Sequence, residues 1–122
     1  MPPTSPWLPP ESDAGPPQVL TADELISLLR QRWQASYDLQ LVRRQGRLYL
    51  HVMWGYLEQQ SFPFSADEYA ARVEQVAANL NGLGVGEQVR QWLSSTRDRP
   101  RLGKALSLPL QLPEGRSSEF LL

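Results

Sequence analysis

A capping motif and an apolar stripe mark the first predicted helix. In the segment Thr21-Ala-Asp-Glu24, the Thr21 hydroxyl can accept from the backbone N–H of Glu24, and the Glu24 carboxylate can accept from that of Thr21. Apolar residues then recur three and four positions apart, on one face of a helix: Leu25, Leu28, Leu29 and Trp33. The pattern predicts a helix from about residue 22 to about residue 35.

A second capping motif, Ser65-Ala-Asp-Glu68, precedes another stripe of helical period. The stripe consists of Tyr69, Val73, Val76, Ala77 and Leu80. Asn81-Gly82 is typical of a left-handed helix stop. A third helix is expected at about 86–95. Its inner face carries Val85, Val89, Trp92 and Leu93.

Two regions have the period of two that is typical of strands. Residues 39–54 form a predicted hairpin around Gln45-Gly46, and its return strand is apolar on both faces. Such a strand is usually central in its sheet. Leucines at 106, 108, 110 and 112 predict a third strand, with Pro109 on an edge that needs no donor. The order α-β-β-α-α-β predicts an α+β fold, a three-stranded sheet with the helices packed on one face.

Composition divides the chain into three parts. Seven of its eleven prolines lie in residues 1–17, so residues 1–19 are predicted to form a disordered proline-rich arm. Residues 20–112 form the single predicted domain, and residues 113–122 a flexible tail. The chain has no apolar run long enough to span a membrane and no secretory signal, so no membrane insertion is expected.

The totals exclude several kinds of chemistry. The 122 residues contain no cysteine and one histidine, His51, which rules out thiolate catalysis and sites of several cysteines or histidines. No phosphate-binding glycine loop or nucleophile elbow occurs. No cofactor or metal is therefore expected. An enzyme would need His51, Glu58 or Asp67 in a shared pocket, and no pattern brings them together, so a non-enzymatic protein is the main interpretation.

Positive charge is concentrated in two places although the net charge is only −1. Residues 90–104 hold five cations and a single acidic residue, Asp98. If the last strand pairs beside the hairpin, this group adjoins the arginines of the hairpin tip on one basic surface. The candidate cations are Arg43, Arg44, Arg47, Arg97, Arg99, Arg101 and Lys104. Solvated surface charge is the simpler interpretation.

A second candidate site is the aromatic loop from Tyr56 to Phe64. It could hold Tyr56, Glu58 and Gln60 toward a partner, or its aromatic side chains could close the core. Together the two sites favour an interaction module for an unknown, acidic or amphipathic protein partner. The alternative is a nucleic-acid-binding protein that uses the same arginines, with binding that weakens steeply as salt rises.

Two stretches resemble a known family. Tyr56-Leu-Glu-Gln-Gln-Ser-Phe-Pro-Phe64 and Arg99-Pro-Arg-Leu-Gly-Lys-Ala-Leu-Ser-Leu-Pro-Leu110 are similar to a family of cyanobacteria and plant plastids that is classed as a domain of unknown function. The resemblance covers roughly residues 20–112. It implies a photosynthetic source and a cytoplasmic or, in plastids, stromal setting. It implies no reaction, cofactor or catalytic residue.

Overall fold

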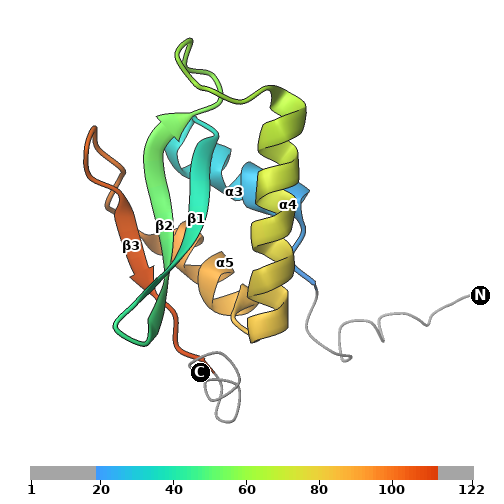
Figure 1. The fold of residues 1–122 in the computed structure, drawn as a ribbon, viewed down its shortest axis with the longest axis vertical. Helices are drawn as coiled ribbons and strands as arrows, with labels where there is room; N and C mark the ends of the chain where they lie inside the picture. Colours follow the sequence, from blue (N-terminus) through green and yellow to red (C-terminus); the bar gives the residue numbers. More distant parts are fainter. Residues whose placement is uncertain (1–18, 113–122) are drawn as a thin grey trace, which may run out of the picture.

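The computed structural model describes residues 19–112. The predicted tail over 113–122 and all but the last residue of the predicted arm lie outside this range. The described chain runs through six elements in the predicted order α-β-β-α-α-β, and the α+β class is confirmed. Three helices pack on one side of a three-stranded antiparallel sheet (Figure 1).

Helix α3 (Ala22–Trp33) begins as the capping pattern predicts, with the Thr21 hydroxyl accepting from the Glu24 N–H at 3.1 Å. The other half of the predicted capping box is wrong. Both Glu24 carboxylate oxygens accept instead from the Arg90 guanidinium, 66 positions along the chain. A side chain expected to stabilise its own helix end therefore ties α3 to another helix.

Helix α4 (Ala66–Leu83) has the complete capping box, with reciprocal bonds between Ser65 and Glu68. The predicted stop at Asn81-Gly82 is wrong, because the left-handed residue is Gly84, with a φ of 78°. Asn81 has another role. Its side-chain amide donates to the Leu20 carbonyl at 2.8 Å and accepts from the Leu20 N–H at 2.9 Å, which fixes the start of the described chain. Helix α5 (Gly86–Ser95) follows directly.

Strands β1 (Tyr37–Arg44) and β2 (Arg47–Tyr56) form the predicted hairpin. Its two-residue turn needs positive φ at both positions, and Gln45 and Gly46 supply φ values of 53° and 78°. Strand β2 is central, between β1 and β3 (Leu106–Pro109).

Strand β3 is shorter than predicted. The ladder ends at Pro109, so the expected strand as far as Leu112 is wrong, although the Leu110 N–H still donates to the Leu48 carbonyl at 3.0 Å. Alternate residues of an antiparallel strand bond to the same neighbour. The backbone of Pro109 therefore faces the outer edge, where its missing N–H costs no ladder bond, as predicted.

The core lies between the sheet and the helices. Leu50 and Val52 of β2 are fully buried at its centre. Each helix adds side chains to the same cluster, among them Leu25, Leu29, Val73, Leu80, Val89 and Leu93. Within residues 19–112 no helix combines the length and the hydrophobicity that crossing a lipid bilayer requires.

The Glu24–Arg90 ion pair makes stability depend on pH. The hydrogen bond from Arg90 holds the pKa of Glu24 below its usual value of 4.5, although partial burial opposes this shift. A carboxyl group whose pKa is lower in the folded state contributes stability above its unfolded pKa and loses that contribution as the pH falls through its folded pKa. Glu24→Gln should therefore lower the Tm at neutral pH and flatten its fall between about pH 6 and about pH 3.

Thermal unfolding across this range checks the expectation. Asp23→Asn serves as the control, because Asp23 is an exposed neighbour with no ion pair inside the described range. It should keep the wild-type slope. A Glu24→Gln profile parallel to that of the wild type would contradict the assignment.

Candidate anion-binding site

The segment between α5 and β3, residues 96–105, is held to the domain although it has no regular structure over most of its length. The indole N–H of Trp33 donates to the Asp98 carbonyl at 3.0 Å, and the Asp98 N–H donates to the Thr96 hydroxyl at 3.3 Å. Pro100 is buried. These contacts fix the backbone, so the cationic side chains next to them start from defined positions.

A tight turn reverses the segment before β3. The backbones of Arg101 and Lys104 exchange hydrogen bonds of 3.1 and 2.8 Å. Gly103 has a φ of 78°, which favours glycine because a Cβ is strained there. The turn brings two cations that are three positions apart in the sequence to opposite ends of one backbone bridge.

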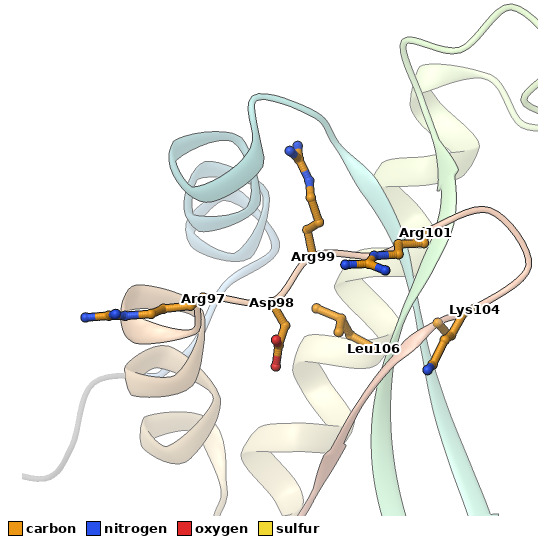
Figure 2. A pocket seen from close by; sticks show the side chains of 7 residues that line it. Arg97, Asp98, Arg99, Arg101, Lys104 and Leu106 are labelled. Atoms are coloured by element: carbon orange, nitrogen blue, oxygen red, sulfur yellow. The ribbon is translucent and has the colours of Figure 1, made fainter.

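A cavity of about 430 Å³ opens between this segment and the start of β3. We call it the cationic cavity; its lining is Arg97, Asp98, Arg99, Arg101, Lys104, Ala105 and Leu106. In Figure 2, Arg101 lies above Leu106 and Lys104 to its right, and the Arg99 side chain extends upward, toward the chain between α3 and β1. Arg97 extends the other way, past the end of α5. The lining residues thus include four cations, one carboxylate and a small apolar patch, with the Arg97 side chain directed away from the other three cations.

The arginines of the helices are used differently from these cations. Each of the helical arginines is bound within the domain: Arg30 to Ser36 and Glu58, Arg32 to the carbonyls of Leu93 and Ser94, Arg72 to Asp38, and Arg90 to Glu24 and Glu87. The four cations of the cavity form no ion pair with any residue from 19 to 112. Their charge is therefore available to an external anion.

The hairpin-tip arginines do not join this site. Leu106 pairs with Val52, whereas Arg44 pairs with Arg47 five positions further back along β2. At roughly 3.3 Å per residue, the tip and the Lys104 turn are about 23 Å apart. Figure 1 shows them at opposite ends of the sheet. The expectation of one basic surface formed by Arg43, Arg44, Arg47 and the 97–104 group is therefore wrong.

The aromatic loop also serves a structural purpose. Glu58 accepts from the Ser36 N–H at 2.9 Å and from the Ser36 hydroxyl at 2.8 Å. Partial burial opposes its ionisation, but the Ser36 hydrogen bonds outweigh this effect, and the pKa of Glu58 is lowered. Tyr56 packs edge-on against Tyr37, with ring centroids 5.5 Å apart. Gln60 is exposed. The loop does not bring these three residues to the cationic cavity.

The candidate catalytic residues lie on different elements. His51 is half-buried on β2, where burial and the charge of Arg44 lower its pKa. Glu58 is bound to Ser36, and Asp67 is exposed in the first turn of α4. Over residues 19–112 no group of three or more histidine and acidic side chains is arranged to hold a metal ion.

Trp33 is the part of the site that the sequence did not reveal. Its position in an apolar stripe indicates core packing, and the side chain is indeed 6% exposed. The indole N–H is the one signal that could have been used, because a buried tryptophan N–H usually has a hydrogen-bond acceptor. That acceptor belongs to the segment that carries the cations.

The fold and the site define a small α+β domain with a cationic cavity at one end of its sheet. A family model described as "Domain of unknown function (DUF3067)" matches residues 23–121, and the chain belongs to this family. The chain is similar to the Alr2454 protein from Nostoc sp. strain PCC 7120, known from a solution NMR structure. The two are 47% identical, with a TM-score of 0.75 over 84% of this chain and 98% of that chain. No curated protein matches the chain. The resemblance predicted from the two motifs is confirmed.

Trp33→Phe tests the anchoring of the cavity. The change removes one buried donor, so stability should fall by roughly 1 kcal/mol. Amide hydrogen exchange at Arg101 and Lys104 should accelerate more than exchange in β2, because the segment loses its attachment. Trp92→Phe removes an indole N–H that has no acceptor inside the described range. It should leave the ratio between the exchange rates at the turn and those in β2 unchanged. Equal acceleration in β2 and at the turn would show that Trp33 stabilises only the domain as a whole.

Proposed function

We propose that this chain is a non-enzymatic protein-interaction module that binds an acidic or amphipathic segment of a partner protein in the cationic cavity. The observation that carries the proposal is the contrast among the cations. Those on the helices are bound within the domain: Arg30, Arg72 and Arg90 by carboxylates, and Arg32 by two backbone carbonyls. In contrast, Arg97, Arg99, Arg101 and Lys104 form no ion pair with the described residues.

The composition of the cavity suits a polypeptide that carries carboxylates. Arginine forks can bind carboxylates through two parallel hydrogen bonds. Ala105 and Leu106 offer apolar contact to a neighbouring side chain of the partner. Asp98 can accept from a backbone N–H of the same segment, so its negative charge fits a peptide better than a polyanion.

A single-stranded nucleic acid fits this cavity less well. Such ligands stack their bases on aromatic side chains, and the residues that line the cavity include no aromatic one. The carboxylate of Asp98 would also repel phosphate. Nucleic-acid binding is therefore the second candidate. Binding measurements with a peptide probe and with an oligonucleotide probe distinguish the two functions.

The non-enzymatic role and the cellular setting are the other parts of the proposal. The separation of His51, Glu58 and Asp67 supports a role without catalysis. The similarity to a Nostoc protein supports a cyanobacterial source, and we infer a cytoplasmic setting there.

Charge reversal in the cavity tests the proposal. The probes are a fluorescein-labelled peptide of alternating glutamate and leucine and a labelled oligouridylate of equal length, measured by anisotropy at low and moderate salt. Arg99→Glu together with Arg101→Glu should weaken peptide binding at least about tenfold, equivalent to about 1.4 kcal/mol. Peptide binding should also weaken as salt rises, because exposed charges are screened.

The matched control reverses the same number of charges at the other end of the sheet, Arg44→Glu together with Arg47→Glu. It should change the affinity for the peptide by less than about twofold. Equal losses in the two variants would contradict a specific site. Tighter binding of the oligouridylate, with a steep salt dependence, would favour nucleic acid instead.

A further inference from the structure

The face of the sheet opposite the helices has no covering element within residues 19–112. Side chains of one parity along each strand point to this side, and the register aligns them in rows across the strands. The rows are Arg44–Arg47, then Val42–Tyr49–Pro109, then Gln40–His51–Ser107, with Met53 beyond them. We call this surface the open face. Val42, Tyr49, His51 and Met53 are half-buried there.

The Met53 end of the open face leads into an apolar groove. A cavity of about 370 Å³ lies between β2, the aromatic loop and the start of α4. Its wall includes Met53, Trp54, Phe62, Pro63 and Phe64. Its polar end is neutral overall, because Arg72 binds Asp38 through two hydrogen bonds of 3.1 and 2.7 Å and lies over the Phe64 ring at 4.4 Å. The groove therefore suits a large apolar side chain.

The other end of the open face is cationic. Arg44 and Arg47 close the hairpin and are exposed, without an ion pair to any described residue. The charge of Arg44 reaches along the face, since it contributes, after burial, to the lowered pKa of His51. An occupant that complements both ends carries a bulky apolar residue at one end and acidic residues at the other.

The N-terminal segment of this chain has that chemistry. Residues 1–18 contain seven prolines, the apolar pair Trp7-Leu8 and the acidic residues Glu11 and Asp13, but no lysine or arginine. Proline-rich segments bind aromatic grooves in the polyproline II conformation. At about 3.1 Å per residue in that conformation, Trp7 and Asp13 are about 19 Å apart. Arg47 and Met53 are six positions apart along β2, about 20 Å.

The place where residues 1–18 join the domain agrees with an arrangement in which the acidic residues bind the hairpin-tip arginines and Trp7 binds the groove. Leu20 is bound to Asn81 near the end of α4. Figure 1 shows this part of the chain at the right, beside α4, and the hairpin tip at the lower left, both in the lower half of the view. Asp13 lies seven positions before Leu20, a stretch of chain that reaches up to about 23 Å. The acidic residues therefore come first from the attachment point and Trp7 last, in the same order as the arginines and the groove.

We propose that the open face is a docking surface for the chain's own residues 1–18, with Glu11 and Asp13 on Arg44 and Arg47 and with Trp7 in the groove between Trp54 and Phe64. This surface lies outside the cationic cavity, and the proposal does not depend on the proposed function. Residues 1–18 precede the part of the chain that the family model matches.

Paramagnetic relaxation in the full chain tests the docking. The sequence has no cysteine, so Ser5→Cys provides a single site for a spin label, and its two methionines make Met53 one of only two methyl-labelled signals. A tethered segment acts at an effective concentration on the order of millimolar. Docking of even modest intrinsic affinity should therefore weaken the Met53 methyl signal by about twofold or more relative to the reduced label.

Variants at both ends separate this contact from other causes. Trp7→Ala, Glu11→Arg with Asp13→Arg, and Arg44→Glu with Arg47→Glu should each restore the Met53 signal. Arg99→Glu with Arg101→Glu should leave the broadening unchanged, so failure of the docking and failure of the proposed function are distinguishable. Absence of broadening, or broadening that survives all three disrupting variants, would overturn the proposal.

A mixed sample identifies the molecule that supplies the segment. Methyl-labelled chain without the spin label is combined with spin-labelled chain without methyl labels. Docking within one molecule leaves Met53 unaffected in this mixture. Broadening in the mixture would mean that a second copy occupies the open face and would overturn the intramolecular proposal.

Discussion

The central position of β2 is the constraint on which the rest of the structure depends. Leu50 and Val52 are completely buried, and each pairs with a residue of β1 on one side and of β3 on the other. Removing apolar side chains from water provides the main favourable free energy of folding. Here that burial requires the strand from the far end of the domain to lie against the hairpin. The 96–105 segment has to reach the starting point of β3, and its anchoring by Trp33 follows from this requirement.

Much of the fold could be predicted because local patterns and the global structure agree. The third helix occupies the predicted residues 86–95, and β2 was expected to be central because both of its faces are apolar. The helix end at Gly84 was missed because two plausible stops, Gly82 and Gly84, lie two positions apart. Only packing of the final turn, in which Leu83 is buried, decides between them.

The site was less predictable, for a geometric reason. A period of two in the sequence indicates a strand but gives neither its direction nor its register. The cations of 97–104 and of the hairpin tip were expected to adjoin once β3 paired with β2, and β3 does pair there. The antiparallel register, however, makes β3 start at the end of β2 opposite the hairpin tip. Long-range pairs were also missed, such as Arg90 with Glu24 and Arg72 with Asp38. The partners are separated by 66 and by 34 positions in the sequence, and no local pattern connects residues that far apart.

The outward backbone of Pro109 affects how copies of this domain meet one another. An edge strand normally offers a row of free donors and acceptors to any passing strand. On β3 the outward N–H at position 109 is missing, and the strand is only four residues long. A neighbouring molecule could form few ladder bonds there, so this side of the sheet resists the edge-to-edge growth that leads to fibrils. The protection comes from the proline ring, which takes the place of the backbone N–H, and it needs no covering helix.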